Sequence, residues 1–220
     1  MVFEKKLIST KNLDLANEKR FINRELSWLS FNERVLEEAK NTKHPILERL
    51  RFLSISGNNL DEFHMVRVAG LTKQVRERFK TKSADGRTPI DQLKDVTYSL
   101  RKLIDRQQVM WEELKRILSK EKIEVLDSQN DFSKHKNEIF SIFDQEILTS
   151  LTPIAIDPTI PFPFLSNLSS TLVLSLSKEK NKRFNAIVMF PENLQRFYKI
   201  YKDKDIFIKT EDIVLLNIKK

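Results

Sequence analysis

The segment from Asn23 to Arg67 constrains the fold more than any other part of the chain. Its apolar residues recur every three or four positions among many charges, a pattern typical of amphipathic helices that pack on one another. In its second half lies Gly57-Asn58-Asn59, in which a helix-ending glycine is followed at once by a helix-starting asparagine. We therefore expect a junction between two helices here, with backbone N–H groups and a short amide exposed to a ligand.

Helical periodicity continues beyond this junction, and four helices with short connections are expected. They cover approximately residues 26–40, 45–57, 60–79 and 89–120. Pro45 and Pro89 suit the first positions of two of them, with Thr88 as a cap. Asn59 and Glu62 resemble a capping box at the start of the third helix. This pattern predicts a helical bundle.

Apolar stripes predict the buried faces of these helices. In the first helix the stripe is Trp28, Phe31, Val35 and Ala39. In the second it is Ile46, Leu50 and Leu53. In the fourth it is Ile90, Leu93, Val96, Leu100, Leu103, Trp111, Leu114 and Leu118, with an interruption at Gln107.

The composition changes after residue 120. A short β-branched segment (123–126) precedes an amphipathic helix (133–149) with Ile139, Phe140, Phe143 and Ile147 on its apolar side. Four prolines exclude regular helix between residues 152 and 164. Segments 171–177 and 184–190 are expected to form a hairpin, followed by a strand near Phe207 and a helix starting at Glu211-Asp212.

These patterns predict an α+β fold that is mainly α. We expect a flexible lead-in (1–20), a helical amino-terminal domain (21–120) and a partial, truncated α+β head domain (121–220). Because two strands alone are only marginally stable, we expect sequence outside this chain to complete the sheet.

Composition excludes several classes of protein. With three glycines and neither GxGxxG nor GxxxxGK[ST], the chain lacks a dinucleotide-binding fingerprint and a P-loop. Without cysteine it has no disulfide or thiolate site, and its three histidines, far apart in sequence, predict no metal site. No apolar run is long enough for a transmembrane helix and no signal peptide is recognisable, so a cytoplasmic location is expected.

Basic residues outnumber acidic ones, 39 to 31, giving a net charge of +8. Such a charge favours polyanionic partners: nucleic acid, polyphosphate, nucleotides or an anionic membrane. A solvated basic surface without a partner explains the charge equally well.

Several residues near the junction are candidates for chemistry. The Asn59 amide both donates and accepts hydrogen bonds and so suits a purine edge, although Asn58-Asn59 also reads as a simple helix cap. Trp28 and Phe31 are either core residues or a stacking wall for a base. His64 is a candidate general base or phosphoryl acceptor, but it lacks an orienting partner in the sequence.

Charged residues surround the same region, and each has a structural alternative as a surface charge or helix ion pair. The candidate phosphate-binding residues are Arg24, Arg34, Arg49, Arg51 and Arg67. The candidate acid–base residues are Glu25, Glu33, Glu37, Glu38, Asp61 and Glu62.

Two long strings, FINRELSWLSFNERVLEEA and RFLSISGNNLDEFHMVRVAGL, closely resemble the amino-terminal domain of bacterial polyphosphate kinase. A third, TPIAIDPTIPFPFLSNLS, resembles the start of that family's head domain. The resemblance runs, with gaps, from about Phe21 to the end of the chain. It implies a phosphotransferase that reversibly moves the terminal phosphate of ATP to polyphosphate, with ATP as substrate and Mg²⁺ required.

The resemblance also assigns roles. It implies that Asn59, the second asparagine of NNLDEF, contacts the adenine of ATP. The phosphorylated histidine, the arginines that hold phosphate and the Mg²⁺ site belong to two later domains, so none of His44, His64 or His135 takes a catalytic role. The family further implies a homo-oligomer formed through the head domain, and peripheral membrane association is left open.

We therefore expect the amino-terminal part of a polyphosphate kinase, with no catalytic or metal-binding residue of its own, inactive when alone. No nucleic-acid partner is expected. The alternatives are a non-catalytic basic helical module that binds RNA or another polyanion, and a truncated or degenerate reading frame.

Overall fold

A computed structural model describes residues 17–127, 132–157, 159, 161–178 and 182–218. The chain divides into two compact units, Met1–Trp111 and Glu112–Lys220. The division falls inside one long helix, α4 (Pro89–Lys120). Most of the expected lead-in, residues 1–16, lies outside the described residues.

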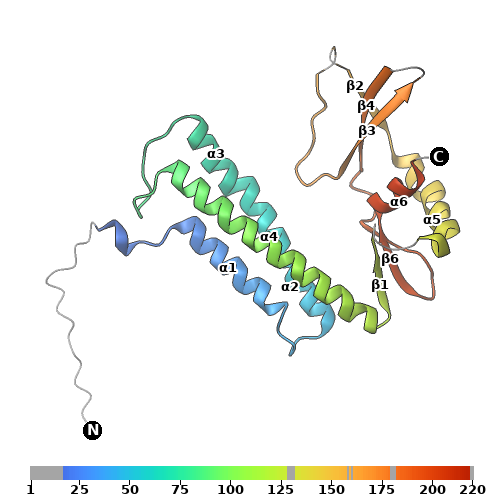
Figure 1. The fold of residues 1–220 in the computed structure, drawn as a ribbon, viewed down its shortest axis with the longest axis horizontal. Coiled ribbons are helices and arrows are strands. Elements are labelled where there is room, and N and C mark those ends of the chain that lie inside the picture. The colour runs from blue at the N-terminus through green and yellow to red at the C-terminus, as the bar shows by residue number, and fades with distance from the viewer. Residues whose placement is uncertain (1–16, 128–131, 158, 160, 179–181, 219–220) are drawn as a thin grey trace, which may run out of the picture. The chain divides into compact units, whose positions relative to one another are not determined.

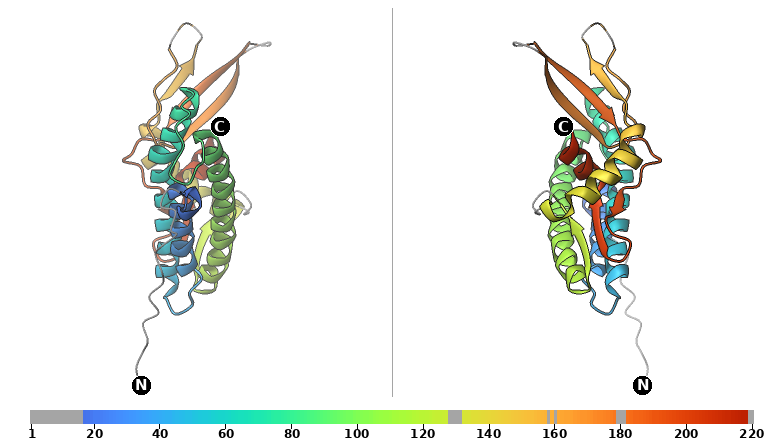
Figure 2. Two further views of the ribbon diagram at one scale, coloured as in Figure 1. Left: turned by 90° about the vertical axis from the view of Figure 1, so that its left-hand side faces the viewer. Right: turned by 90° about the vertical axis from the view of Figure 1, so that its right-hand side faces the viewer.

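The first unit consists of three helical rods that run side by side (Figures 1 and 2). The first is α1 (Arg24–Glu38), preceded by a short 3₁₀ turn, η1 (Glu18–Arg20). The second comprises α2 (Ile46–Phe63), a π-helical turn η2 (His64–Val68) and α3 (Ala69–Arg76). The third is the part of α4 within this unit. The helical bundle is confirmed, but with three rods in place of four helices.

The expected junction at Gly57-Asn58-Asn59 is wrong. Helix α2 passes through all three residues without a break, and Gly57 does not adopt a positive φ. Asn59 is therefore an interior helical residue, neither an N-cap nor part of a capping box with Glu62. A glycine weakens a helix by only about 1 kcal/mol, which packing against α1 outweighs.

Side-chain caps set two helix starts. The Asn23 side chain accepts hydrogen bonds from the backbone N–H groups of Glu25 (3.0 Å) and Leu26 (3.1 Å), so α1 starts two residues earlier than expected. Pro89 opens α4, as expected, and Thr88 accepts a hydrogen bond from the Asp91 N–H (3.3 Å) through its hydroxyl.

The buried face of α1 is offset from the predicted stripe, and only Ala39 belongs to both. It is formed by Leu29, Asn32, Leu36 and Ala39. Trp28 is half-buried and Phe31 is 46% exposed. The periodicity misplaced this face because Asn32, a polar residue, is fully buried.

The predicted faces of α2 and α4 also need correction. In α2 the buried positions are Arg49, Ser56, Leu60 and Phe63, whereas Ile46, Leu50 and Leu53 are half-buried. In α4 the buried stripe is Val96, Leu100, Leu103, Met110, Leu114 and Leu118, and Ile90 at its start is 51% exposed.

The second unit contains a three-stranded mixed sheet in the order β1-β6-β5. Strand β1 (Ile123–Leu126) pairs in parallel with β6 (Asp205–Lys209), and β5 (Phe197–Lys199) pairs antiparallel with β6.

The expected helix 133–149 is broken into η3 (Ser133–His135), α5 (Lys136–Ile142), the π turn η4 (Phe143–Ile147) and η5 (Leu148–Ser150). Helix α6 (Thr210–Asn217) follows β6 directly. Ile139, Ile147, Ile208 and Ile213 meet in the core of this unit, and the expected apolar residue Phe140 is 42% exposed.

A second three-stranded sheet has the order β2-β4-β3. Strands β3 (Thr171–Lys178) and β4 (Lys182–Met189) form the expected antiparallel hairpin, and β2 (Pro153–Ile156), from the proline-rich segment, pairs with the other edge of β4. Ala186, Ile187 and Val188 are buried in succession, as expected for a central strand covered on both faces.

Candidate functional site

Asn59 lies in the third to fourth turn of α2, on the side that faces α1. Its side chain is half-buried, and its Nδ2 donates a hydrogen bond to Asn32 Oδ1 on α1 (3.2 Å). Asn58, one position earlier, is exposed. The structure therefore separates the two asparagines that the sequence places together.

A chain of polar contacts holds Asn59 in place. Asn32 is fully buried and donates through Nδ2 to the backbone oxygen of Ser56 (3.0 Å). Gln107 on α4 donates to the Ser56 hydroxyl (2.9 Å). The network joins α1, α2 and α4, and it explains why the apolar stripe of α4 is interrupted at Gln107. Polar groups that are hydrogen-bonded in this way fix a local geometry.

The Asn59 carboxamide retains hydrogen-bonding capacity beyond this network. Asn32 occupies one of its two N–H donors, and within the described part of the chain the other donor and Oδ1 form no hydrogen bond. An acceptor and a donor side by side on a held, half-exposed amide match the edge of a purine base.

The two candidate aromatic residues differ in their surroundings. Trp28 stacks on the buried ring of Phe63, with centroids 4.5 Å apart and an interplanar angle of 18°. One face of its indole is thus used within the protein. Phe31 is nearly half exposed, and the Arg34 guanidinium lies 6.0 Å from the centre of its ring.

The five candidate arginines do not converge on one point. Arg49 is buried and donates through Nε to the carbonyl oxygen of Ala39 (2.7 Å), so it caps the carboxyl end of α1. Arg51 pairs with Glu48 (3.6 Å), and Arg67 lies 3.8 Å from Glu25. The two remaining arginines likewise show no phosphate clamp: Arg34 bonds to the Ser30 carbonyl (3.3 Å), and Arg24 is exposed.

The candidate acids also have structural roles or lie in solvent. Glu38 pairs with His44 (3.0 Å), and hydrogen bonds from Asn41 and His44 lower the pKa of Glu38. Glu33 pairs with Arg106 on α4 (3.0 Å). Glu37, Asp61 and Glu62 are exposed or nearly so.

The other two histidines lie in different surroundings. His64 is exposed on the π turn η2, and His135 Nδ1 lies 2.9 Å from the Tyr201 hydroxyl in the second unit. Where the chain is described, no three or more carboxylate or histidine side chains gather in a way that could hold a metal ion. None of its described helices is both long and apolar enough to cross a membrane.

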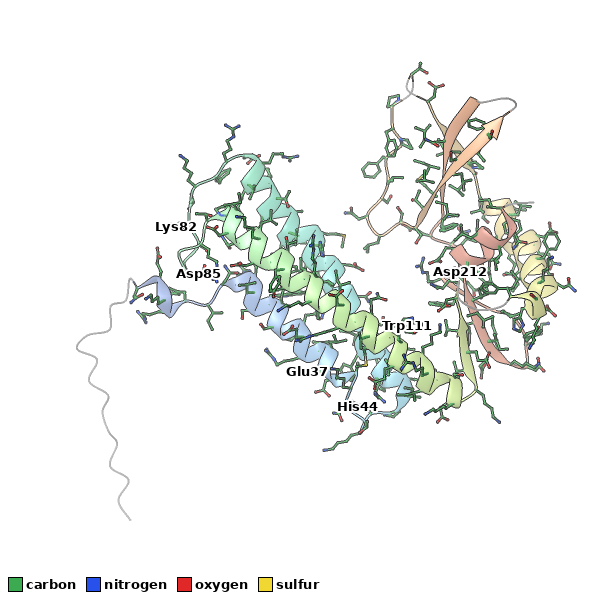
Figure 3. The ribbon with its side chains drawn as sticks, viewed as in Figure 1. Glu37, His44, Lys82, Asp85, Trp111 and Asp212 are labelled. Atoms are coloured by element: carbon green, nitrogen blue, oxygen red, sulfur yellow. The ribbon has the colours of Figure 1, made fainter. Side chains whose placement is uncertain are left out.

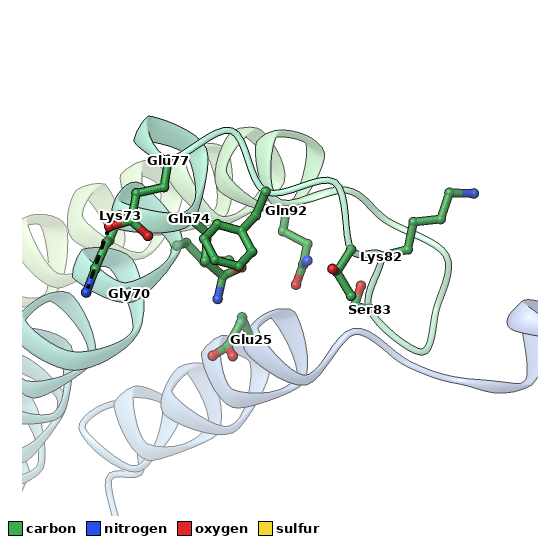
Figure 4. A pocket seen from close by; sticks show the side chains of 11 residues that line it. Glu25, Gly70, Lys73, Gln74, Glu77, Lys82, Ser83 and Gln92 are labelled. Carbon is green, nitrogen blue, oxygen red and sulfur yellow. Dashed lines mark ion pairs between the residues drawn. The ribbon is translucent and has the colours of Figure 1, made fainter.

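A pocket that the sequence did not predict opens at the end of the first unit that contains the start of α1 (Figure 4). Its volume is about 670 Å³, and it is lined from α1 by Glu25, from α3 by Gly70 and Lys73, and from the following loop by Phe79 and Lys82. Asn59 is not part of it. The sequence feature that could have drawn attention to this region is the run of basic residues at the end of α3.

Comparison with known proteins defines the class of these two units. Residues 21–126 match the sequence model of the polyphosphate kinase N-terminal domain, and residues 134–220 match that of the polyphosphate kinase middle domain. A helical unit followed by an α+β unit is the fold expected for those domains. The chain belongs to the polyphosphate kinase family.

Individual relatives support this assignment. The chain is 42% identical over 196 residues to the polyphosphate kinase of Erythrobacter litoralis, covering 89% of this chain and 27% of that protein. It is 40% identical over 219 residues to the polyphosphate kinase of Halalkalibacterium halodurans, covering 97% and 31%. The crystal structure of polyphosphate kinase from Porphyromonas gingivalis superimposes with a TM-score of 0.75 at 25% identity, covering 90% of this chain and 30% of that one. The chain thus spans less than a third of the length of these relatives.

Proposed function

We propose that this chain is the amino-terminal part of a polyphosphate kinase that reversibly transfers the terminal phosphate of ATP to inorganic polyphosphate. Membership of the family and the match to both of its first two domains support the proposal. The reaction depends on positioning and charge stabilisation around the phosphates. Because the chain spans 27% of a polyphosphate kinase relative, we assign Mg²⁺ binding and phosphoryl transfer to the rest of the enzyme, and we propose that this segment alone is inactive.

The proposed contribution of this chain to the site is recognition of adenine by Asn59. The observation that carries it is the held, half-buried carboxamide with a free donor and a free acceptor. Adenine presents an N–H donor and a ring nitrogen acceptor next to each other, and asparagine pairs with both at once.

The backbone plays no part in this recognition. Because Asn59 lies inside α2, its N–H is not one of the unbonded groups found at a helix start, which removes the argument from the helix dipole. The side chain alone remains, and one such contact contributes about 0.5–1.5 kcal/mol net. Its effect on nucleotide affinity is therefore tenfold or less.

The second unit is proposed to supply contacts between subunits. Several large apolar side chains are exposed on the hairpin β3–β4 and on the loop before it. They are Phe162 (64%), Phe164 (87%), Leu168 (70%) and Val173 (68%). Exposed large apolar side chains are typical of surfaces that meet another protein.

The adenine proposal is tested by Asn59→Ala in the complete enzyme. We expect the KM for ATP and for ADP to rise about three- to tenfold with little change in kcat, because a ground-state contact is lost. The same variant should lose preference for ATP over inosine triphosphate, whose base has a carbonyl in place of the amino group.

Asn58→Ala is the matched control, because it removes the same amide from the exposed neighbouring position. It should leave both KM values unchanged. If neither KM moves in Asn59→Ala while the protein remains folded by circular dichroism, the adenine role is wrong.

A further inference from the structure

Positive charge is concentrated in one short stretch of the first unit, residues 73–82, which we call the basic segment. It holds five cations, Lys73, Arg76, Arg78, Lys80 and Lys82, and one carboxylate, Glu77. Its net charge of +4 is half of the formal charge of the chain, in 10 of its 220 residues. The segment covers the last turn of α3 and the start of the loop to α4.

All five cations are accessible to solvent. Each is exposed, and the side chains of Lys73 and Lys82 are 66% and 57% exposed. Lys73 lies 4.0 Å from Glu77 and Lys82 lies 3.9 Å from Glu18, both at the outer limit of an ion pair. Arg76, Arg78 and Lys80 form no ion pair with any residue that the structure describes.

Arg78 places a charged side chain at a backbone position where glycine is usually found. The N–H of Arg78 bonds to the Val75 carbonyl (3.0 Å), and the N–H of Phe79 bonds to the Gln74 carbonyl (3.0 Å). This is the Schellman ending of α3, and Arg78 occupies its left-handed position with φ of 58°. Glycine is the usual residue there because a side chain is strained in this conformation.

The other end of the segment is fixed by a buried carboxylate. Asp85, labelled in Figure 3, accepts hydrogen bonds from Ser83, Arg87 (2.5 Å) and Asn23 (3.3 Å). Burial alone would raise the pKa of Asp85, but these hydrogen bonds outweigh it and lower the pKa. The segment is thus held between the end of α3 and a charged anchor that stays ionised.

The helix dipole does not explain this arrangement by itself. Cations in the last turn of a helix are favoured by its partial negative charge, which accounts for Lys73 and Arg76. The effect falls off within one turn, so it does not account for Lys80 and Lys82 in the loop. Every second residue from Arg76 to Lys82 is a cation, and such a row presents a line of charge and hydrogen-bond donors.

We propose that the basic segment is a docking surface for an inorganic polyphosphate chain. The proposal rests on the proposed function, which makes this polyanion the molecule that the enzyme extends. A polyphosphate chain carries a regular row of negative oxygens and no bases or apolar groups. Its recognition therefore requires a row of exposed cations and donors, which the segment supplies.

The chemistry of the segment disfavours other anionic partners. Single-stranded nucleic acid is bound through aromatic side chains that stack on successive bases, and a membrane surface is bound through an apolar face beside the cations. Phe79 is the one aromatic residue of the segment, and it lines the neighbouring pocket.

The polyanion lies along the outside of the segment and not in that pocket. Glu25 and Glu77 contribute carboxylates to the pocket lining and would repel it. Lys73 and Lys82 also belong to the lining, and Figure 4 shows the Lys82 side chain extending away from Glu25.

The test measures binding of sodium polyphosphate of defined length to the 220-residue chain by isothermal titration calorimetry at several salt concentrations. The variant Arg76→Gln/Arg78→Asn/Lys80→Gln removes three charges, with asparagine chosen because it tolerates the left-handed position. We expect the Kd to rise about tenfold or more near 0.1 M salt, with a shallower dependence on salt.

Lys94→Gln/Arg101→Gln/Lys102→Gln is the matched control, because it removes three exposed cations from α4 in the same unit. Its Kd should change less than about threefold. The single variant Arg78→Gly provides a second check: relief of the left-handed strain should raise Tm while polyphosphate affinity falls. A purely structural role for Arg78 would not separate these two readouts.

Three outcomes would overturn the proposal: no polyphosphate binding by the unaltered chain, equal weakening by both triple variants, or tighter binding of RNA or of phosphatidylserine vesicles at the same salt. The result is independent of the adenine proposal, because ATP affinity is measured at Asn59 and polyphosphate affinity at the basic segment.

Discussion

Single buried polar residues decide how the helices of the first unit are oriented. Asn32, Ser56 and Arg49 all lie at positions that a hydrophobic pattern assigns to solvent, yet none is more than 6% exposed. Each is satisfied by a hydrogen bond to a neighbouring helix or to the end of one. Because a buried polar group costs free energy unless it is bonded, these contacts select one rotation of each helix.

Arg49→Met tests the cap on the end of α1. Methionine keeps much of the volume but removes the donor to Ala39, leaving a helix-terminal carbonyl without that partner. We expect the free energy of unfolding to fall by about 2 kcal/mol, measured by urea denaturation. Arg51→Met, at an exposed position, should change it by less than about 0.5 kcal/mol. Equal effects of the two substitutions would contradict the capping role.

Asp212 on α6, labelled in Figure 3, gives the second unit a dependence on pH. Burial raises its pKa, Lys209 at 3.6 Å offsets part of the rise, and Glu211 adds to it. The unfolded chain loses this proton near pH 3.9, its ordinary value, while the folded chain holds it to higher pH. The free energy of unfolding therefore falls as pH rises above about 3.9 and levels off above the raised pKa.

Asp212→Asn should remove this component of the pH dependence. Denaturation from pH 3 to pH 7 should show the variant gaining stability relative to the parent as the pH rises. Asp61→Asn, at an exposed position on α2, is the control and should follow the parent curve. A difference in the free energy of unfolding between Asp212→Asn and the parent that stays constant across this range would show that the pKa of Asp212 is not raised.

At the scale of the element, α2 shows how packing overrides local signals. Gly57-Asn58-Asn59 has the residues of a helix junction, yet the helix continues to Phe63 and is prolonged by η2 and α3. Helix caps contribute about 1 kcal/mol, whereas one fully buried leucine or phenylalanine contributes about 1.5–3 kcal/mol. Leu60 and Phe63, just after the expected junction, are both buried, and this burial offsets the local preference for a break.

Gly57→Ala distinguishes a continuous helix from a junction. The methyl group of an alanine at Gly57 would lie more than 4 Å from every atom outside the neighbouring residues and the adjoining backbone of the helix. Alanine should therefore stabilise the protein by about 0.5–1 kcal/mol. Gly86→Ala is the opposing control, because Gly86 has φ of 81° and alanine is strained there. Thermal unfolding should show Tm rising in the first variant and falling in the second. A fall in Tm for Gly57→Ala would contradict a continuous helix and favour a junction at this residue.

At the scale of the molecule, the order of the two units follows from the sequence. The change from helical periodicity to short strands near residue 120 predicts it, and the matches to residues 21–126 and 134–220 agree with that order. The boundary between the two compact units lies between Trp111 and Glu112, inside α4. The domain boundary expected at residue 120 stays a prediction.

Local patterns determined the fold class, the hairpin β3–β4, the cap of α4 and the long motifs that identify the family. These features depend on residues close together in the chain, where spacing and side-chain type act directly. The rotation of α1, the parallel pairing of β1 with β6, the network around Asn59 and the two ends that hold the basic segment were decided only in three dimensions. Each depends on a contact between residues far apart in sequence, such as Asn32 with Asn59 or Asn23 with Asp85, whose free energy exists only once the elements have packed.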